Sequence, residues 1–292
     1  MPRFSLIVAT YGRADELRHL LSTLVRQSFS DYEVIVVDQN DDDRIPLILS
    51  EFSASIEFNH VRCSPGVSKA RNLGLSLATG EIIAFPDDDC WYTPNLLANI
   101  DGWFRKNPQY SIFAVGAEDS EGIASGNRWI QSRCDLHPLN IFRTTFCSTL
   151  FIRHEAAVKQ AFFDETIGLG SRTTFDCGDE TDFVLQLMVA GLRGRFDRTW
   201  HIGHPRRDML SHTISRQRAL GYGRGMGRVL RKHSLYGVWM GLLMYDLMRA
   251  AAVMVTGRTT SAGLCFAHCR GVFSGFSASI VPKIPLEEEV NP

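Results

Sequence analysis

Residues 4–38 decide the fold, and they read "FSLIVATYGRADELRHLLSTLVRQSFSDYEVIVVD". The first seven are a short apolar run rich in strand formers, and residues 32–38, "YEVIVVD", form a second such run. Between the two runs, residues 14–27 place leucines at helical spacing. Strands that are apolar throughout are typical of a parallel sheet with helices on both faces. This stretch therefore predicts a βαβ unit.

The same alternation of strands and helices continues through the first hundred residues. Residues 56–61 predict a third strand, and residues 68–80, "SKARNLGLSLATG", predict a helix closed by a glycine. Residues 82–94, "IIAFPDDDCWYTP", begin as a fourth buried strand. We therefore predict an α/β fold with a Rossmann-like, mostly parallel sheet. Ligands of such sheets bind beyond the carboxyl ends of the strands.

Three consecutive carboxylates end the fourth strand. Two unit charges about 5 Å apart repel by roughly 3 kcal/mol at an effective dielectric constant near 20, so packing alone does not explain Asp87, Asp88 and Asp89. Either the three side chains are spread in solvent as an acidic turn, or a cation lies among them. The same edge of the sheet should collect the polar residues that end or follow the first two strands: Thr10, Tyr11, Arg13 and Asp38.

The middle of the chain predicts loops, a strand and an acidic helix start. Residues 117–146 are irregular and polar, and residues 147–153 predict a strand. Residues 178–191 predict a helix whose first turn carries Asp179, Glu180 and Asp182. Acids there complement the helix dipole by about a few tenths of a kcal/mol. Three of them are more than that role requires.

The last ninety residues change character and contain two apolar segments with a helical pattern. Residues 237–257 are long enough to span a bilayer, but Asp246 and Arg249 lie near the middle. Each would cost roughly 2.5–3.5 kcal/mol at the membrane centre, and at a spacing of three they could pair on one helix face. A helix in the membrane interface, or one packed on the catalytic domain, therefore fits better than a spanning helix. Residues 264–276 predict a second such segment.

A basic segment precedes these helices. Residues 221–227, "GYGRGMG", have a glycine at every second position. No strand precedes them and the three-residue gap is absent, so they are not a dinucleotide fingerprint; we predict a flexible, basic hinge beside the membrane. One acid and eight basic residues between positions 204 and 233 indicate an anionic partner or surface: Arg206, Arg207, Arg216, Arg218, Arg224, Arg228, Arg231 and Lys232.

Composition sets the class of protein. Apolar content of 45% and charged content of 22% are those of a globular protein, and a net charge of −1 gives no reason to expect nucleic acid as a partner. The seven cysteines form no CxxC pair, which favours reduced thiols in the cytosol over a disulfide or metal framework. The N-terminus lacks the pattern of a secretory signal. We expect a cytoplasmic protein, peripheral on the inner face of the cell membrane.

Three blocks of sequence together resemble family 2 glycosyltransferases. They are "FSLIVATYGRADELRHLLSTLVRQSFSDYEVIVVDQNDDD", "PGVSKARNLGLSLATGEIIAFPDDDCWYTPNLL" and "GDETDF". The resemblance covers roughly residues 3–204 and implies the GT-A fold. We accordingly expect a glycosyltransferase domain at 1–205, with a nucleotide-binding half at 1–115 and an acceptor half at 116–205. Residues 206–292 would form a basic and hydrophobic helical C-terminal region that associates with the membrane.

The resemblance also implies an activity, the transfer of a sugar from a nucleotide-sugar to an acceptor hydroxyl with inversion at the anomeric carbon. In the family an Asp-x-Asp segment binds the metal, which corresponds here to Asp87 and Asp89 with Asp88 between them. Hard carboxylate ligands suit Mn²⁺ or Mg²⁺, and such an ion would neutralise the diphosphate. The remaining nucleotide-sugar contacts implied are Thr10, Tyr11, Arg13, Asp38 and Arg71, although Asp38 alone could cap a turn and Arg71 could be an ordinary surface arginine.

An inverting displacement also needs a base to take the proton of the acceptor hydroxyl. The family usually has Glu-Asp at the helix start, with the aspartate as base, whereas this chain has Asp179 followed by Glu180. Position favours Glu180, then Asp179, then Asp182, with helix capping as the alternative for all three. His204 is a candidate metal or diphosphate contact because related enzymes often have a histidine in this region, but a lone histidine is more often structural.

The predicted function is a metal-dependent, hexosyltransferase-type enzyme of bacterial cell-surface polysaccharide synthesis. The donor would be a UDP-, dTDP- or GDP-sugar, and the acceptor a saccharide or lipid-linked saccharide. Residues 117–146 and 164–177 should set the choice of both. A nucleotidyltransferase that makes nucleotide-sugars is one alternative. Such an enzyme needs a glycine-rich loop with a basic residue after the first strand, and the stretch "TYGRADE" matches that pattern poorly. An inactive glycosyltransferase-like subunit of a complex is the other.

Overall fold

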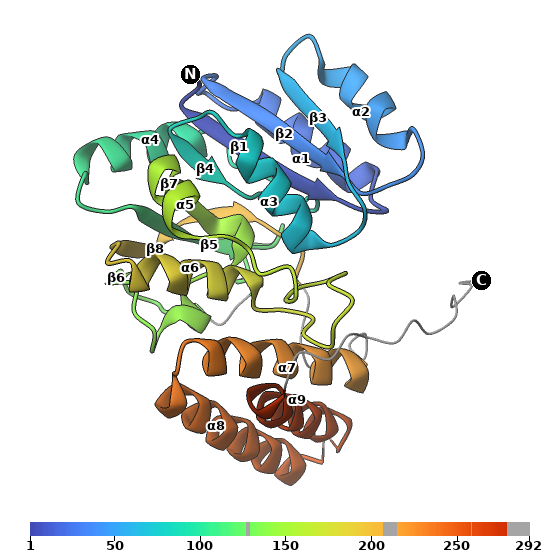
Figure 1. The fold of residues 1–292 in the computed structure, drawn as a ribbon, viewed down its shortest axis with the longest axis vertical. Coiled ribbons are helices and arrows are strands. Elements are labelled where there is room, and N and C mark those ends of the chain that lie inside the picture. The colour runs from blue at the N-terminus through green and yellow to red at the C-terminus, as the bar shows by residue number, and fades with distance from the viewer. Residues whose placement is uncertain (127–128, 207–214, 258, 279–292) are drawn as a thin grey trace. The chain divides into compact units, whose positions relative to one another are not determined.

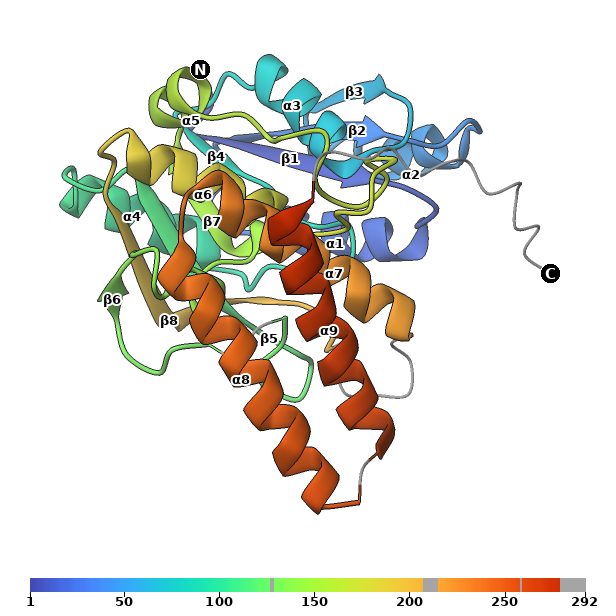
Figure 2. The same cartoon turned by 60° about the horizontal axis from the view of Figure 1, so that its bottom comes forward.

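The computed structural model describes residues 1–126, 129–206, 215–257 and 259–278. These residues form two compact units, which are drawn in Figure 1 and, turned by 60°, in Figure 2. The first unit takes in the described parts of 1–65, 69–163 and 180–207. The second takes in 66–68, 164–179 and the described residues after 208.

The first unit is built on an eight-stranded sheet with the order β3-β2-β1-β4-β7-β5-β8-β6. Its strands are β1 (Phe4–Thr10), β2 (Tyr32–Asp38), β3 (Phe58–Arg62), β4 (Ile82–Ala84), β5 (Ile112–Glu118), β6 (Cys134–Asp135), β7 (Leu150–Arg153) and β8 (Gly194–Gly203). Its helices are α1 (Asp15–Val25), α2 (Arg44–Phe52), α3 (Val67–Leu77), α4 (Leu96–Lys106), α5 (His154–Gln160) and α6 (Asp179–Val189), with short 3₁₀ turns at Ile141–Arg143 and Cys147–Thr149.

The predicted α/β fold is confirmed, with some corrections. Strands β3, β2, β1 and β4 run parallel, as do β5 and β8. Strand β7 is antiparallel to both β4 and β5, so the sheet is mixed. The strand expected at 147–153 begins only at Leu150, because the three residues before it form a 3₁₀ turn. Elements α2, α4, α5, β5 and β6 were not predicted.

The order of the strands places a topological switch point between β1 and β4. From β1 the chain moves outward through β2 to β3 and then returns to pair β4 with the other side of β1. Right-handed crossovers in opposite directions place their helices on opposite faces, and Figures 1 and 2 show α1 and α3 on opposite sides of the sheet. The carboxyl ends of β1 and β4 therefore meet at a topological switch point, where sheets of this type bind ligands.

The second unit contains α7 (Arg216–Lys232), α8 (Tyr236–Val255) and α9 (Thr259–Ser277). The prediction of a flexible hinge at 221–227 is wrong, because these residues lie inside the continuous helix α7. In a helix, alternate positions point to two different sides. A Cβ on Gly225 would lie 2.0 Å from the backbone oxygen of Cys177, and one on Gly223 would lie 2.2 Å from that of His268 in α9. The glycines thus let two backbones approach α7 closely.

Helix α8 carries the one described stretch that is long and apolar enough to cross a membrane by length and composition. Only 11% of that window is buried. The suggested partner of Asp246 was Arg249, but the structure pairs its carboxylate with Nδ1 of His268 in α9 at 2.6 Å. The buried carboxylate of Asp246 is thereby hydrogen-bonded across the hairpin of α8 and α9.

Candidate active site

The three acids after β4 lie in a tight turn at the switch point. The backbone N–H of Cys90 donates to the carbonyl of Asp87 at 3.1 Å and closes the turn. The residues Asp88 and Asp89 are only 5% and 7% exposed. The alternative of an acidic turn spread in solvent is therefore wrong. Burying carboxylates is costly unless they are paired and hydrogen-bonded, and the residues around them provide those partners.

The loop after β1 binds two of the acids. Nη1 of Arg13 lies 2.6 Å from Oδ1 of Asp88 and 2.8 Å from Oδ2 of Asp89. The hydroxyl of Thr10 donates to Asp88 at 2.9 Å. Burial raises the pKa of Asp88 to about 6, although Arg13 and Thr10 act in the opposite direction. The carboxylates in turn outweigh burial and raise the pKa of Arg13. Tyr11, by contrast, is 61% exposed and extends from the same loop.

The third acid is bound from α3. Nη2 of Arg71 lies 3.0 Å from Oδ1 of Asp87, and its guanidinium carbon lies 5.6 Å from the centre of the Phe163 ring. Arg71 is buried, so the reading of an ordinary surface arginine is wrong. The phenyl ring and the carboxylate together hold the guanidinium at the carboxyl end of β4.

His204 follows β8 and points toward the acids. Its Nε2 lies 3.5 Å from Oδ1 of Asp89. Its Nδ1 lies 2.8 Å from the carbonyl oxygen of Pro205, which can only accept a hydrogen bond, so Nδ1 carries a proton and donates it. Ser125 contacts the same nitrogen at 3.2 Å, and the Phe146 ring packs edge-on at 5.0 Å. These contacts hold the ring with Nε2 on the side of the acids.

Asp87, Asp89 and His204 could hold a metal ion together. One potential ligand atom from each lies within 4.8 Å of those from the other two. A histidine whose second nitrogen donates to a backbone carbonyl has the usual orientation of a metal ligand. Two carboxylates suit a hard divalent ion such as Mn²⁺ or Mg²⁺. The donor set therefore fits the ion that the sequence predicts.

The end of β2 forms a second polar cluster in the first unit. Asp38 is fully buried and accepts hydrogen bonds from the backbone and side-chain nitrogens of Asn40 at 2.9 and 2.8 Å. From β3, His60 approaches the same carboxylate at 3.2 Å and Arg62 at 3.5 Å. Asn40, His60 and Arg62 were missed by the sequence analysis. Since β3 pairs with β2 in parallel, the end of the third predicted strand was the signal that could have located the last two.

Helix α6 is anchored close to the acidic turn. Phe183 packs edge-on against Phe85, which lies two residues before Asp87, with ring centres 5.9 Å apart. Phe163 stacks on Phe183 at 4.3 Å. Of the three acids in the first turn of α6, Asp182 is fully buried and accepts from Gln186 at 2.8 Å. Asp179 is also buried, whereas Glu180 is partly exposed.

Comparisons with known proteins agree with this arrangement. The model of the family described as glycosyl transferase family 2 matches residues 5–165. An uncharacterized glycosyltransferase of Haemophilus influenzae is 24% identical over 184 residues, which cover 63% of this chain and 61% of that protein. The minor teichoic acid biosynthesis protein GgaB of Bacillus subtilis is 27% identical over 180 residues, which cover 57% of this chain and 20% of that protein. The chain thus spans less than two thirds of either relative.

A solved structure shares the fold. The mannosyltransferase PcManGT from Pyrobaculum calidifontis, in complex with GDP-Man and Mn²⁺, aligns with a TM-score of 0.64 at 15% identity. The alignment covers 93% of this chain and 87% of that one. The family match extends over more than half of the 292 residues. The chain therefore has the GT-A fold and belongs to glycosyl transferase family 2.

Proposed function

We propose that this glycosyltransferase moves a sugar from a nucleotide-diphosphate sugar to an acceptor hydroxyl with inversion, in the synthesis of a bacterial cell-surface polysaccharide. The observation that carries the proposal is the convergence of Asp87, Asp89 and His204 at the switch point of the sheet. The teichoic acid protein among the relatives supports the pathway class, and the structural neighbour with GDP-Man and Mn²⁺ supports the donor class.

Asp87, Asp89 and His204 would hold Mn²⁺ or Mg²⁺. Bound there, the ion would act as a Lewis acid toward the diphosphate. The first loop would bind the nucleotide-sugar through Thr10, Tyr11 and Arg13, helped by Arg71 and Asp88. Arg13 and Arg71 already lie among the acids, so their positive charges are available where the diphosphate would bind. Asp38 would contact the nucleoside from the end of β2.

The base would be Glu180. An inverting reaction needs a carboxylate that can reach the acceptor hydroxyl. Asp182 is fully buried with Gln186 as a partner, and Asp179 is buried too, whereas Glu180 retains access to solvent. The reversed order of Asp179 and Glu180 therefore leaves the more accessible of the two carboxylates at position 180.

The C-terminal unit would attach the enzyme to the cytoplasmic face of the membrane. The outward side of α8 carries large apolar side chains that are at least half exposed: Met240, Met244, Leu247, Met248 and Met254. Basic residues of α7, Arg216 to Lys232, would face lipid head groups or the pyrophosphate of a lipid-linked acceptor; Arg207, counted with them, lies outside the described residues. Washing isolated membranes with high salt and with alkali tests this attachment. Recovery of all the protein in the soluble fraction at low salt, before any such wash, would refute it.

Calorimetry tests the catalytic proposal. UDP, dTDP and GDP are titrated with and without Mn²⁺ into the wild type, into Asp89→Asn, and into Asp31→Asn, an exposed acid outside the site, as control. We expect metal-dependent binding of one nucleotide by the wild type and the control, and its loss in Asp89→Asn. Absence of binding for every nucleotide with metal present would refute the proposal and favour an inactive subunit.

A further inference from the structure

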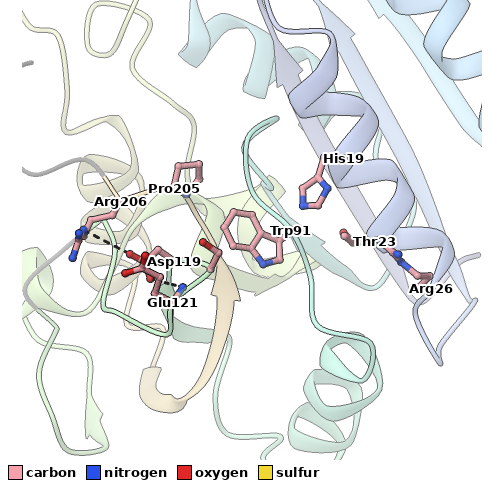
Figure 3. A pocket seen from close by; sticks show the side chains of 9 residues that line it. His19, Thr23, Arg26, Trp91, Asp119, Glu121, Pro205 and Arg206 are labelled. Atoms are coloured by element: carbon pink, nitrogen blue, oxygen red, sulfur yellow. Dashed lines mark hydrogen bonds and ion pairs between the residues drawn. The ribbon is translucent and has the colours of Figure 1, made fainter.

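A groove of about 840 Å³ lies beside the candidate metal site and has no role in the proposed chemistry. Its volume falls within the roughly 300–1,000 Å³ of small-molecule sites. Figure 3 shows Trp91 in the middle, with His19 of α1 and Arg26 just after that helix on one side, and the turn at Asp119 and Glu121 with Arg206 on the other. All of these residues belong to the first unit.

Trp91 is fixed in the groove as a flat platform. Its backbone exchanges two hydrogen bonds with Gly203 at the end of β8, of 2.9 and 2.8 Å. A Cβ on Gly203 would lie 1.9 Å from both Nε1 and Cε2 of the indole and 2.4 Å from Cδ1. The atoms Cδ1, Nε1 and Cε2 are consecutive atoms of the indole ring. A point so close to all three lies above the plane of the ring, so Gly203 packs against its face. One face of the indole therefore rests on β8. The rest of the ring lines the groove together with His19, whose ring centre lies 5.7 Å from that of the indole at an interplanar angle of 64°.

The rim of the groove is polar and of mixed charge. Oδ1 of Asp119 accepts the backbone N–H groups of Glu121 and Ile123 at 2.9 Å, which orders the turn. Oδ2 of Asp119 lies 3.6 Å from Nε of Arg206. The exposed side chains of Glu121 and Arg26 add an acceptor and a donor group. Since the rim carries both acids and arginines, the groove suits an uncharged polar ligand better than an anion.

An apolar ring face surrounded by hydrogen-bonding groups matches the chemistry of a pyranose. The C–H groups on one side of a sugar ring pack on an aromatic face, and its hydroxyl groups take the two-pronged hydrogen bonds that carboxylates and guanidinium groups offer. A purely apolar ligand would leave the rim desolvated and unpaired.

Two chain segments link the groove to the candidate metal site. Trp91 lies two residues after Asp89, and Arg206 lies two residues after His204, whose Nε2 is 3.5 Å from Asp89. We propose that the groove is a saccharide subsite, which binds a sugar unit of the acceptor other than the one that reacts. The inference rests on the proposed function, because it takes the acceptor to be a saccharide.

Saturation-transfer NMR on the full chain tests the subsite. The probes are N-acetylglucosamine, methyl β-galactopyranoside, methyl α-mannopyranoside and lactose. We expect transfer to the ring C–H protons of at least one sugar, an affinity at least tenfold lower in Trp91→Ala, and an affinity within about threefold of wild type in Trp91→Phe, which keeps an aromatic face. Glu57→Gln, an exposed acid far along the chain from the groove, is the control that should change nothing.

The outcomes separate the subsite from the catalytic proposal, because nucleotide calorimetry is run on the same preparations. Normal nucleotide binding with no sugar signal, or with a signal unchanged in Trp91→Ala, overturns the subsite and leaves the catalytic proposal intact. A sugar signal lost in Trp91→Ala, in a protein that binds no nucleotide, refutes the catalytic proposal alone. Should Trp91→Ala not fold, the exposed substitutions His19→Ala and Glu121→Gln replace it, and an unchanged sugar affinity in both overturns the subsite.

Discussion

Substituting Gly223 by alanine tests the close packing of α7 on α9. The added Cβ would lie 2.2 Å from the carbonyl oxygen of His268, 2.9 Å from the backbone nitrogen of Val272 and 3.0 Å from Cα of Gly271. All three are backbone atoms, so no side-chain rotation relieves the overlap and the helices must separate. Overpacking of this kind costs roughly 1–3 kcal/mol, and the better helix propensity of alanine offsets about 1 kcal/mol of it. We expect a net loss of up to about 2 kcal/mol in the free energy of unfolding.

The matched control is Gly241→Ala in α8. Gly241 is also inside a helix, but a Cβ there would meet no atom within 4 Å. The substitution should therefore keep only the helix-propensity gain of about 0.5–1 kcal/mol. Two identical changes in one helical unit are thus expected to shift stability in opposite directions.

Thermal and urea unfolding followed by circular dichroism measure both variants of the full chain in mild detergent. The unfolding midpoint should fall for Gly223→Ala and rise for Gly241→Ala. Should Gly223→Ala be as stable as Gly241→Ala or more so, α7 is not packed closely on α9, and a flexible hinge at 221–227 would again explain the alternating glycines.

Three further predictions concern the first unit. His204→Ala should weaken Mn²⁺ binding at least about tenfold because it removes one ligand, and the EPR signal of the free ion measures this affinity. The control is His201→Ala, whose ring lies 3.6 Å from Glu118 and which should bind Mn²⁺ as the wild type does. An equal loss of affinity in both variants would contradict the assignment of His204. Glu180→Gln should slow sugar transfer about 10²–10⁴-fold with nucleotide affinity unchanged, and a full rate would move the role to Asp179. Burial opposes ionisation of Glu33, but hydrogen bonds from Ser5 and Thr79 outweigh it and lower its pKa. The pKa of Glu33 in the folded protein is thus below the ordinary 4.5. The ionised Glu33 therefore stabilises the folded protein above that pH, and this contribution disappears as the pH falls through the folded pKa. Acid unfolding curves of Glu33→Gln should accordingly converge with wild type at low pH, and a constant difference between them would refute the shift.

The sequence by itself determined the first four strands, the helices α1 and α3 and the place of the acids, whereas α2 was missed. These elements are local: apolar runs and leucines at helical spacing need no distant partner to be recognised. The rule that ligands bind at the carboxyl ends of parallel strands then predicted that Thr10, Arg13 and Asp87–Asp89 converge, and the structure brings them together. Their roles in binding stay predictions.

Features that depend on pairing between distant segments were decided only by the tertiary structure. Strand β5 was missed because its place between β7 and β8 depends on strands that follow it in the sequence. The sequence shows a lone His204, but the carbonyl of Pro205 and the position of Asp89 orient its ring nitrogens. Likewise, alternating glycines have no local signal that separates a loose hinge from a helix packed on two sides. Free energy from burial and close packing is a property of surfaces that meet in three dimensions, and these surfaces are adjacent only after the chain has folded.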